Sequence, residues 1–403
     1  MAFAELFADL DALAAFGGET GGGVSRTAFS SSFTAAQSWL AGRMSEAGLT
    51  VRIDAAGNLI GRYGPPGPAV LCASHIDSVP HGGRFDGALG VLAGLEAFRH
   101  LKAEAHSFGR ALEIIAFADE EGEYFSLFGS RAMLVLVEAQ EVESARGTRG
   151  KLLVEAMLEA GLDGAEITAA RRPASDFHAY LELHIEQGPI LAQGGFDLGI
   201  VENVVGIETL EVTFTGRPDH SGTTPVRQRK DAMRAAIAYC QGCYDEAARD
   251  AALRLNFGDW SMAPQALNVV AEEVRFRQEI RHPEAAVLSA VVAAARRIAA
   301  ERAAECNAVA QVRSLARDEP ALMHADMQAL LKDCATARGV KFLAMASGAG
   351  HDAQLFAPIC PTGMLFVPSI DGRSHCPEEF STPEAIAIAV TVLTDALKAL
   401  TAK

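Results

Sequence analysis

Three histidines in this chain stand at or shortly after the end of an apolar run: His75, His184 and His375. Asp77 lies two residues beyond His75, so the two share a face if the run is a strand. A carboxylate beside a histidine can accept one ring N–H and aim the other ring nitrogen at a metal ion. Taken singly, each histidine is equally compatible with an ordinary hydrogen-bonded residue at a strand end.

Acidic residues occupy comparable positions. Asp86 ends the glycine-rich stretch Gly-Gly-Arg-Phe-Asp before a helical segment, and Asp119, Glu120 and Glu121 follow the apolar run 112–118. Three consecutive carboxylates repel one another, and a bound cation would relieve that repulsion. The alternatives are that Asp86 caps the helix and that the acidic triplet is a solvated turn.

Together these residues favour a metal site over separate structural roles. Imidazoles and carboxylates with few cysteines suit one or two Zn²⁺, Mn²⁺ or Co²⁺ ions. A two-metal site also needs a carboxylate that bridges the ions and a free carboxylate that acts as general base.

An α/β sheet would position these residues. The pattern predicts strands over 49–53, 59–63, 69–74 and 111–119 and helices between them, including one over about 87–102. Ligand sites in such sheets gather at the carboxyl ends of the strands. The candidate residues that follow the strands therefore belong to one predicted site.

The pattern changes between about residues 206 and 315. Alternating strands over 209–215 and 274–280 are combined with helices over about 230–249 and 283–306. We predict an α/β domain with a mixed central sheet, formed by 1–206 and 316–403. An inserted α+β domain of β-α-β-β-α-β-like order, residues 207–315, would interrupt it.

Composition limits the partners. The 403 residues contain 35 Lys and Arg against 51 Asp and Glu, a net charge of −16, which argues against nucleic acid and anionic membranes. The seven cysteines are scattered and odd in number, which is typical of reduced thiols in a cytoplasmic protein. No secretory signal or membrane-spanning run of about 20 residues is expected. A small-molecule substrate is the predicted partner.

Five motifs give the sequence a family resemblance. They are Gly-Gly-Arg-Phe-Asp-Gly (82–87), Glu-Glu-Gly (120–122), His-Ile-Glu-Gln-Gly-Pro (184–189), Asp-His-Ser-Gly-Thr-Thr-Pro (219–225) and Ser-Gly-Ala-Gly-His-Asp (347–352). With them the chain resembles, over essentially its whole length, the hydantoinase/carbamoylase family of amidases. That family includes N-carbamoyl-L-amino acid hydrolases, allantoate and ureidoglycolate amidohydrolases and β-ureidopropionases, within the binuclear-zinc aminoacylase and carboxypeptidase-like hydrolases.

The resemblance implies two divalent metal ions per subunit, Zn or Mn, with Co or Ni as alternatives. It implies that His75 and His184 bind one ion, that Glu121 and His375 bind the other, and that Asp86 bridges them.

The same resemblance implies further roles. Asp77 would orient His75, and Glu120 would be the general base. His220, in an inserted lid and dimerisation domain, would reach the partner subunit's active site in a homodimer and polarise the substrate carbonyl. Four residues would bind substrate: Gln187, Asn268, Arg281 and His351.

Simpler interpretations remain for three residues. His220 could be a surface turn histidine, Arg281 a solvated charge at a strand end, and Asp352 a helix cap. The strand 209–215 could pair with its twin across a two-fold axis. Three features depart from the family pattern without touching a ligand: His81, Cys376 and the segment after Arg131.

The implied activity is metal-dependent cleavage of the ureido C–N bond of an N-carbamoyl-L-amino acid, giving the amino acid, CO₂ and ammonia. Allantoate or ureidoglycolate amidohydrolase is the alternative, followed by an aminoacylase or dipeptidase. A binding protein that retained the fold would be expected to have lost Glu120 or a ligand, and all are present.

Overall fold

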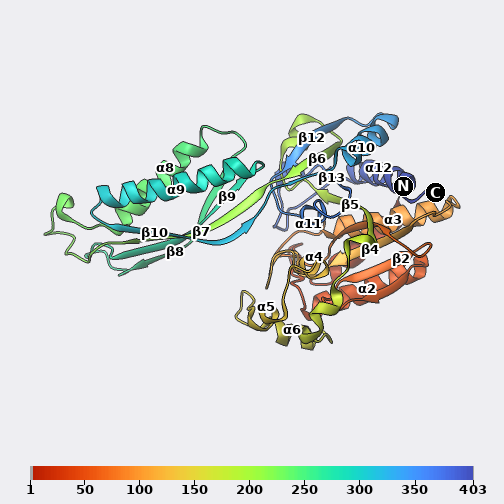
Figure 1. Ribbon diagram of the computed structural model, residues 1–403, viewed down its shortest axis with the longest axis horizontal. Coiled ribbons are helices and arrows are strands. Elements are labelled where there is room, and N and C mark those ends of the chain that lie inside the picture. Colours follow the sequence, from red (N-terminus) through yellow and green to blue (C-terminus); the bar gives the residue numbers. More distant parts are fainter. Residues whose placement is uncertain (1–2, 403) are drawn as a thin grey trace. The chain divides into compact units, whose positions relative to one another are not determined.

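The computed structural model describes residues 3–402, which form two compact units (Figure 1). Unit 1 contains the described residues up to Glu202 and those from Leu322 onward, and unit 2 contains Asn203–Ala321. Each unit has its own hydrophobic core. A mixed α/β sheet interrupted by an α+β insertion is therefore the observed architecture, and the predicted fold class is confirmed.

Unit 1 is built on a nine-stranded sheet of order β1-β2-β4-β3-β5-β13-β6-β11, with β12 paired to β6. Its centre is parallel: β3 (Ala69–His75), β4 (Ala111–Phe117), β5 (Phe177–Ile185) and β13 (Thr362–Val367). The outer strands are β1 (Thr50–Ile53), β2 (Leu59–Tyr63), β6 (Leu198–Val204), β11 (Ala321–Leu322) and β12 (Phe342–Ser347). The four central strands bring their carboxyl ends to one edge of the sheet.

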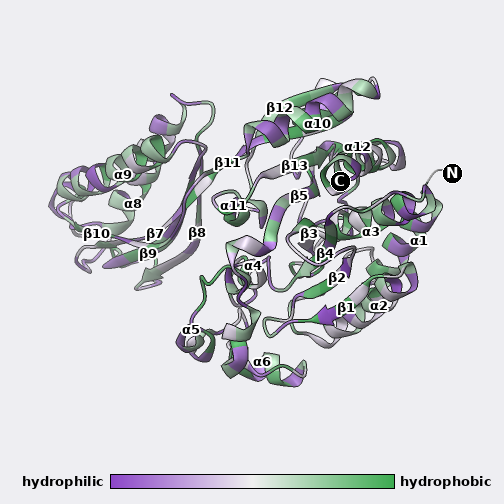
Figure 2. Cartoon of the chain, turned by 45° about the vertical axis from the view of Figure 1, so that its right-hand side comes forward, coloured by the Kyte–Doolittle hydropathy of each residue, from purple (hydrophilic) through white to green (hydrophobic). Residues whose placement is uncertain are grey.

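The central strands are apolar because the sheet is covered on its faces. Every residue of β3, β4 and β13 is buried, as expected for parallel strands. Hydrophilic residues interrupt the apolar course of β5 (Figure 2). The sequence of this strand includes Glu182 and His184. Both are buried, so each needs a polar partner in the interior.

Five long helices accompany this sheet: α1 (Ala4–Ala15), α2 (Ser31–Ala47), α3 (Ala88–Ala103), α10 (Ala325–Ala337) and α12 (Pro383–Thr401). Helix α3 packs on β3, β4 and β5, and α12 packs on α3 and β13. The start of α12 follows from local sequence, because Thr382 accepts a hydrogen bond from the Ala385 N–H and Pro383 begins the helix. Shorter helices are α4 (Phe128–Met133), α5 (Ala139–Ser144), α6 (Leu153–Glu159), α7 (Ile190–Gly194) and α11 (Ala353–Phe356).

A buried arginine ties the N-terminal segment to the end of β3. The Arg26 side chain donates from Nη1 to the carbonyls of Leu13 and Phe16, both at 2.9 Å, and from Nε to the carbonyl of Ile76 at 2.5 Å. Its backbone N–H donates to Ser78 Oγ at 2.9 Å. These hydrogen bonds therefore fix the position of the segment directly after His75.

Unit 2 is a four-stranded antiparallel sheet with two helices. Its strands, in the order β10-β7-β9-β8, are β10 (Val309–Asp318), β7 (Gly206–Thr215), β9 (Glu273–His282) and β8 (Arg254–Ala263). Buried and exposed residues alternate along β7 and β9, and α8 (Ala232–Ala247) and α9 (Ala285–Glu305) pack on the buried face.

The position of β7 corrects one prediction. Strand β7 is bonded to β10 on one side and to β9 on the other, so the expected pairing of 209–215 with a second copy is wrong. The alternating pattern identified a strand but not its place in the sheet. The open edges of this sheet are β8 and β10.

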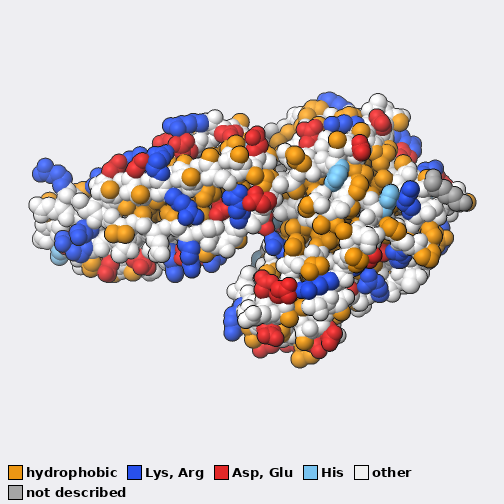
Figure 3. All heavy atoms as spheres, in the orientation of Figure 1, with side chains coloured by type: hydrophobic (Ala, Val, Ile, Leu, Met, Phe, Trp, Pro, Cys, Tyr) orange, Lys and Arg blue, Asp and Glu red, His pale blue; other side chains and the backbone are white. Residues whose placement is uncertain are grey.

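Basic and acidic side chains are interspersed on the face of unit 2 that carries α8 and α9 (Figure 3). The Arg297–Glu301 and Arg302–Glu305 pairs on α9, at 2.9 and 2.6 Å, belong to this mixed surface. Among the helices of residues 3–402, none has the length and apolarity needed to cross a bilayer.

Candidate active site

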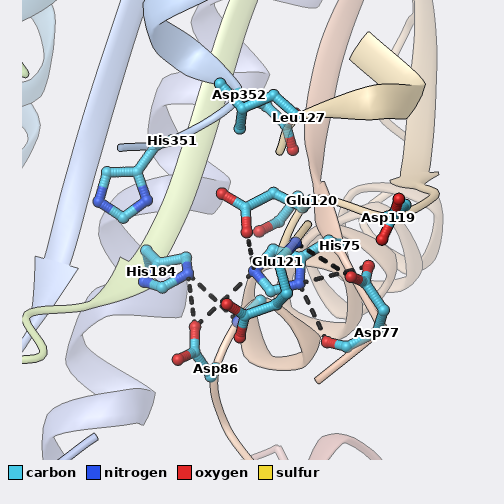
Figure 4. A network of polar contacts seen from close by, with 12 residues as sticks. His75, Asp77, Asp86, Asp119, Glu120, Glu121, Leu127, His184, His351 and Asp352 are labelled. Carbon is cyan, nitrogen blue, oxygen red and sulfur yellow. Dashed lines mark hydrogen bonds and ion pairs between the residues drawn. The ribbon is translucent and has the colours of Figure 1, made fainter. Parts of the chain in front are cut away.

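The predicted metal-site residues of unit 1 converge at the carboxyl edge of the parallel strands (Figure 4). His75 is the last residue of β3, His184 lies at the end of β5, and Glu120 and Glu121 follow β4. Asp86 stands in the loop before α3. His375 comes from the loop between β13 and α12 and completes this cluster, with its Nε2 3.2 Å from Asp86 Oδ2.

Asp86 lies at the centre, and its two oxygens face different partners. Oδ1 is 3.1 Å from His184 Nε2 and 3.7 Å from His75 Nε2. Oδ2 faces His375 Nε2, which is itself 3.5 Å from Glu121 Oε2. The helix-cap interpretation of Asp86 is wrong, because α3 has no side-chain cap and its N-cap residue is Gly87.

Gly87 allows the Asp86 loop to approach His75. Its φ of 62° lies in the left-handed region, and a Cβ there would stand 2.3 Å from His75 Nε2. Any other residue would displace the imidazole from Asp86. The glycine that follows Asp86 is therefore a geometric requirement of the site.

The donor atoms fall into two sets, each compact enough for one ion. The candidate ligand atoms of His75, Asp86 and His184 lie within 4.8 Å of one another, and so do those of Asp86, Glu121 and His375. Nitrogen and carboxylate oxygen donors without thiolates fit Zn²⁺ or Mn²⁺.

The electrostatics of the cluster also fit a cation. Burial, and then the carboxylate of Glu121, raises the pKa of Glu120 well above its usual value; burial and Asp86 do the same to the pKa of Glu121. Among the described residues, Glu121 Oε1 and Asp77 Oδ1 are buried and accept no hydrogen bond. Buried anionic oxygens without donors are stabilised by a bound cation. The solvated-turn interpretation is wrong for Glu120 and Glu121, whose side chains are each 11% exposed.

The first residue of the acidic triplet builds the turn. Asp119 Oδ1 accepts from the N–H of Glu123 at 2.7 Å, and Oδ2 accepts from Tyr124 at 3.0 Å and Phe125 at 2.9 Å. Its own φ is 55°, a left-handed conformation that is uncommon outside glycine. These bonds hold the turn from which Glu120 and Glu121 enter the site.

Asp77 lies beside His75, as predicted, but its backbone makes the hydrogen bond to the imidazole. Its Nδ1 hydrogen-bonds the backbone carbonyl of Asp77 at 3.1 Å, whereas the Asp77 carboxylate is 3.7 Å away. Strand β3 ends at His75, so the strand alternation assumed for Asp77 does not continue. The Asp77 carboxylate instead accepts the Glu121 N–H at 3.1 Å and so connects the two loops.

Two predicted substrate-binding residues also lie in unit 1. Gln187 donates from Nε2 to Asp86 Oδ2 at 2.9 Å, so it contacts the central carboxylate directly. His351 is buried with its ring centroid 4.5 Å from that of His184. The cap interpretation of Asp352 is wrong, because α11 has no side-chain cap and the Asp352 carboxylate accepts from Ser130 Oγ.

The other three predicted residues lie in unit 2. His220 is exposed, and its Nδ1 accepts the N–H of Gly222 at 3.0 Å. Asn268 is exposed on a segment adjoining His220, since Val269 forms a bridge with His220. Arg281 is in β9 and donates to Glu279 at 2.7 Å.

The sequence reasoning missed Glu182. This buried carboxylate accepts from Ser74 Oγ at 3.1 Å, Tyr180 OH at 3.0 Å and the Ala353 N–H at 3.0 Å. It lies near His184 and His351, but its oxygens are already engaged, so it serves as an anchor between segments. A glutamate within the apolar run 179–183 was the available signal.

Comparison with known sequences identifies the family. Residues 71–399 match the sequence model of Peptidase family M20/M25/M40. The chain belongs to this family. Hydrolases of the M20 family are metal-dependent, and the two donor sets around Asp86 accord with that property.

Relatives within the M20 family are amidohydrolases. The chain is 38% identical to the N-carbamoyl-L-amino acid amidohydrolase of Geobacillus stearothermophilus, over 94% of this chain and 93% of that protein. It is 35% identical to the allantoate amidohydrolase of Escherichia coli, over 91% of this chain and 90% of that protein. A crystal structure of a hydantoinase/carbamoylase family amidase from Burkholderia multivorans has a TM-score of 0.90 and 31% identity, over 99% of this chain and 98% of that one. The predicted resemblance is confirmed.

The geometry predicts the effect of replacing the central carboxylate. Asp86→Asn should lower retention of both ions, because each oxygen faces a separate donor set. His75→Ala and His375→Ala should each lower the retention of mainly one ion. Elemental analysis of dialysed, zinc-loaded protein measures this, with the exposed Asp11→Asn as control. An Asp86→Asn protein that keeps two tightly held ions would contradict the arrangement.

Proposed function

We propose that this chain is a two-metal amidohydrolase that cleaves the ureido C–N bond of an N-carbamoyl-L-amino acid to give the amino acid, CO₂ and ammonia. The observation that carries the proposal is Asp86, whose two carboxylate oxygens face two separate donor sets. The Geobacillus stearothermophilus relative, named for this substrate class, supports it.

In this proposal His75 and His184 would hold one divalent ion, Glu121 and His375 would hold the other, and Asp86 would be a ligand in both donor sets. Zn or Mn fits the donors, with Co or Ni as alternatives. When bound, such ions polarise a carbonyl and lower the pKa of water toward neutrality.

Glu120 is the proposed general base. Its Oε2 lies 3.5 Å from His75 Nε2, beside the donor sets, yet it is absent from both of them. A carboxylate that belongs to neither donor set is free to accept and then return a proton. It would take a proton from the attacking water and return it to the leaving nitrogen.

We further propose substrate-binding roles for two residues of unit 2 and two of unit 1. Arg281 can bind a substrate carboxylate through two parallel N–H bonds once it exchanges its contact with Glu279. Asn268, Gln187 and His351 would hold the remaining polar groups.

Allantoate is the second candidate substrate, because the Escherichia coli allantoate amidohydrolase covers the chain at nearly the same identity. We expect the zinc- or manganese-loaded protein to hydrolyse N-carbamoyl-L-amino acids with a higher kcat/KM than allantoate or ureidoglycolate. Ammonia release across the three substrate types measures this, with N-carbamoyl-D-amino acids as control. A higher kcat/KM for allantoate would assign that activity instead.

The role of Glu120 is tested against its neighbour. Glu120→Gln keeps the size of the side chain but cannot accept the proton, so kcat should fall by roughly 10²–10⁴-fold while two ions stay bound. Glu121→Gln should instead lose an ion. Turnover and metal content are measured on the same preparations. Near-normal turnover of Glu120→Gln, or loss of an ion from it, would remove Glu120 from this role.

The chain is further proposed to act as a cytoplasmic homodimer. All seven cysteines are free thiols, as expected in a reducing compartment. Strand β8 is an open edge, and exposed Trp260 and Leu267 line a hollow beside it with Met262. An open strand edge with exposed apolar side chains favours association with a second copy.

In this dimer, His220 would stabilise the oxyanion in the partner's site. Mixed Glu120→Gln and His220→Ala proteins should then regain activity, because one site of each heterodimer has both residues. Mixed Glu120→Gln and Glu121→Gln proteins should not, because both defects affect residues of the same site. Activity after demonstrated subunit exchange is the measurement. No recovery in the first mixture would show that His220 does not act across subunits.

A further inference from the structure

One buried carboxylate connects two loops of the active site without belonging to either donor set. Glu379 is 4% exposed and lies between His375 and helix α12. Its Oε1 accepts the backbone N–H of Phe85 at 2.8 Å and that of Asp86 at 3.1 Å. These two hydrogen bonds fix the backbone that carries the Asp86 carboxylate.

The second oxygen of Glu379 reaches the other loop. Ser374, the residue before His375, has its Oγ 2.9 Å from Glu379 Oε2 and 2.9 Å from Asp86 Oδ2. The hydroxyl thus lies between the two carboxylates. The Ser374 hydroxyl therefore connects the His375 loop to the side chain of Asp86. Glu379 Oε1 contacts the backbone of the same aspartate.

The sequence of the Asp86 loop makes room for this carboxylate. A Cβ on Gly83 would stand 2.0 Å from Glu379 Oε1 and 2.0 Å from its Cδ. No side chain fits there unless the carboxylate moves. Gly83 has no positive φ, so the requirement is for space. This accounts for the second glycine of the motif 82–87 independently of the hydrogen bonds.

Glu379 is not placed as a ligand. Three donors occupy its two oxygens, and it belongs to neither donor set. Its three hydrogen-bond contacts reach the backbone of residues 85 and 86 and the loop that carries His375. A carboxylate kept at such a position has a geometric role.

We propose that Glu379 is a positioning residue that holds Asp86 and the His375 loop in register and so sets the affinity for the ion between Asp86, Glu121 and His375. The inference rests on the proposed two-metal function. His375 depends on such support more than the other ligands, because its side chain is 49% exposed whereas that of Glu121 is 11% exposed and that of Asp86 is 4% exposed.

The test compares four variants with wild type. Glu379→Ala removes the carboxylate, Glu379→Gln keeps an oxygen acceptor for the two N–H groups, and Gly83→Ala displaces an intact Glu379. Glu378→Ala is the matched control, because Glu378 is the preceding residue and pairs only at the surface with Arg373. Metal-stripped proteins are titrated with Zn²⁺ by calorimetry, their melting temperatures are measured, and Co²⁺ absorption spectra report coordination geometry.

We expect Glu379→Ala and Gly83→Ala to bind one of the two ions about tenfold to a hundredfold more weakly, with an altered Co²⁺ spectrum. Glu379→Gln and Glu378→Ala should stay near wild type, since the amide preserves the hydrogen bonds and Glu378 does not reach the site. The metal-free melting temperatures should be similar throughout. If Glu379→Ala fails to fold, Gly83→Ala and Glu379→Gln decide the question.

Two results would overturn the inference. One is wild-type affinity for both ions in Gly83→Ala and in any folded Glu379→Ala. The other is equal loss in Glu379→Gln and Glu379→Ala, which would assign the effect to charge. These outcomes differ from failure of the proposed function, in which the wild-type protein itself would bind fewer than two ions.

Discussion

Several carboxylates are buried together at the carboxyl edge of the parallel strands, and this concentration of like charge constrains the rest of unit 1. Asp77 and Asp86 are buried, and Glu120 and Glu121 are nearly so. Burial, and then the neighbouring carboxylates, raise the pKa of Glu120 and that of Glu121. Such a cluster persists only when cations compensate it and when the surrounding chain holds each group in place.

A second group of buried polar residues holds these carboxylates in place. Asp119 accepts three backbone N–H groups and shapes the turn before Glu120, while Glu182 joins β3, β5 and the start of α11. Arg26 fixes the segment after His75 through the carbonyl of Ile76. Groups that hydrogen-bond around a metal centre orient the ligands and tune affinity. The buried polar residues of unit 1 thus divide into those that face the donor sets and those that fix their backbones.

The donor sets indicate the class of reaction, but they do not indicate which substrate is hydrolysed. Relatives named for N-carbamoyl-L-amino acids and for allantoate match the chain at 38% and 35% identity. Both names describe hydrolysis of a carbon–nitrogen bond, for which one arrangement of ions and general base suffices. Discrimination between such substrates depends on contacts with their remaining polar groups, which is the role proposed for Gln187, Asn268 and Arg281.

The sequence by itself determined the family and the fold class, and it predicted the residues that form the two donor sets. Apolar runs located His75, His184 and His375 at or shortly after strand ends, and the motifs supplied Asp86 and Glu121. Local signals suffice here because a strand or helix is read from spacing within a short segment. The motif Glu-Glu-Gly gave Glu120 and Glu121 their predicted roles, but no local signal gave a role to the adjacent Asp119.

Only the tertiary structure decided what Asp119 does and which strands are edges. Asp119 became a turn anchor because its carboxylate meets the N–H groups that follow, and the carbonyl of Asp77 replaced its carboxylate as the partner of His75 because β3 ends there. Strand β7 became internal because two strands distant in sequence pair with it. Glu379 lies 293 positions from Asp86, whose N–H it accepts. Such contacts depend on long-range packing, which no local pattern encodes.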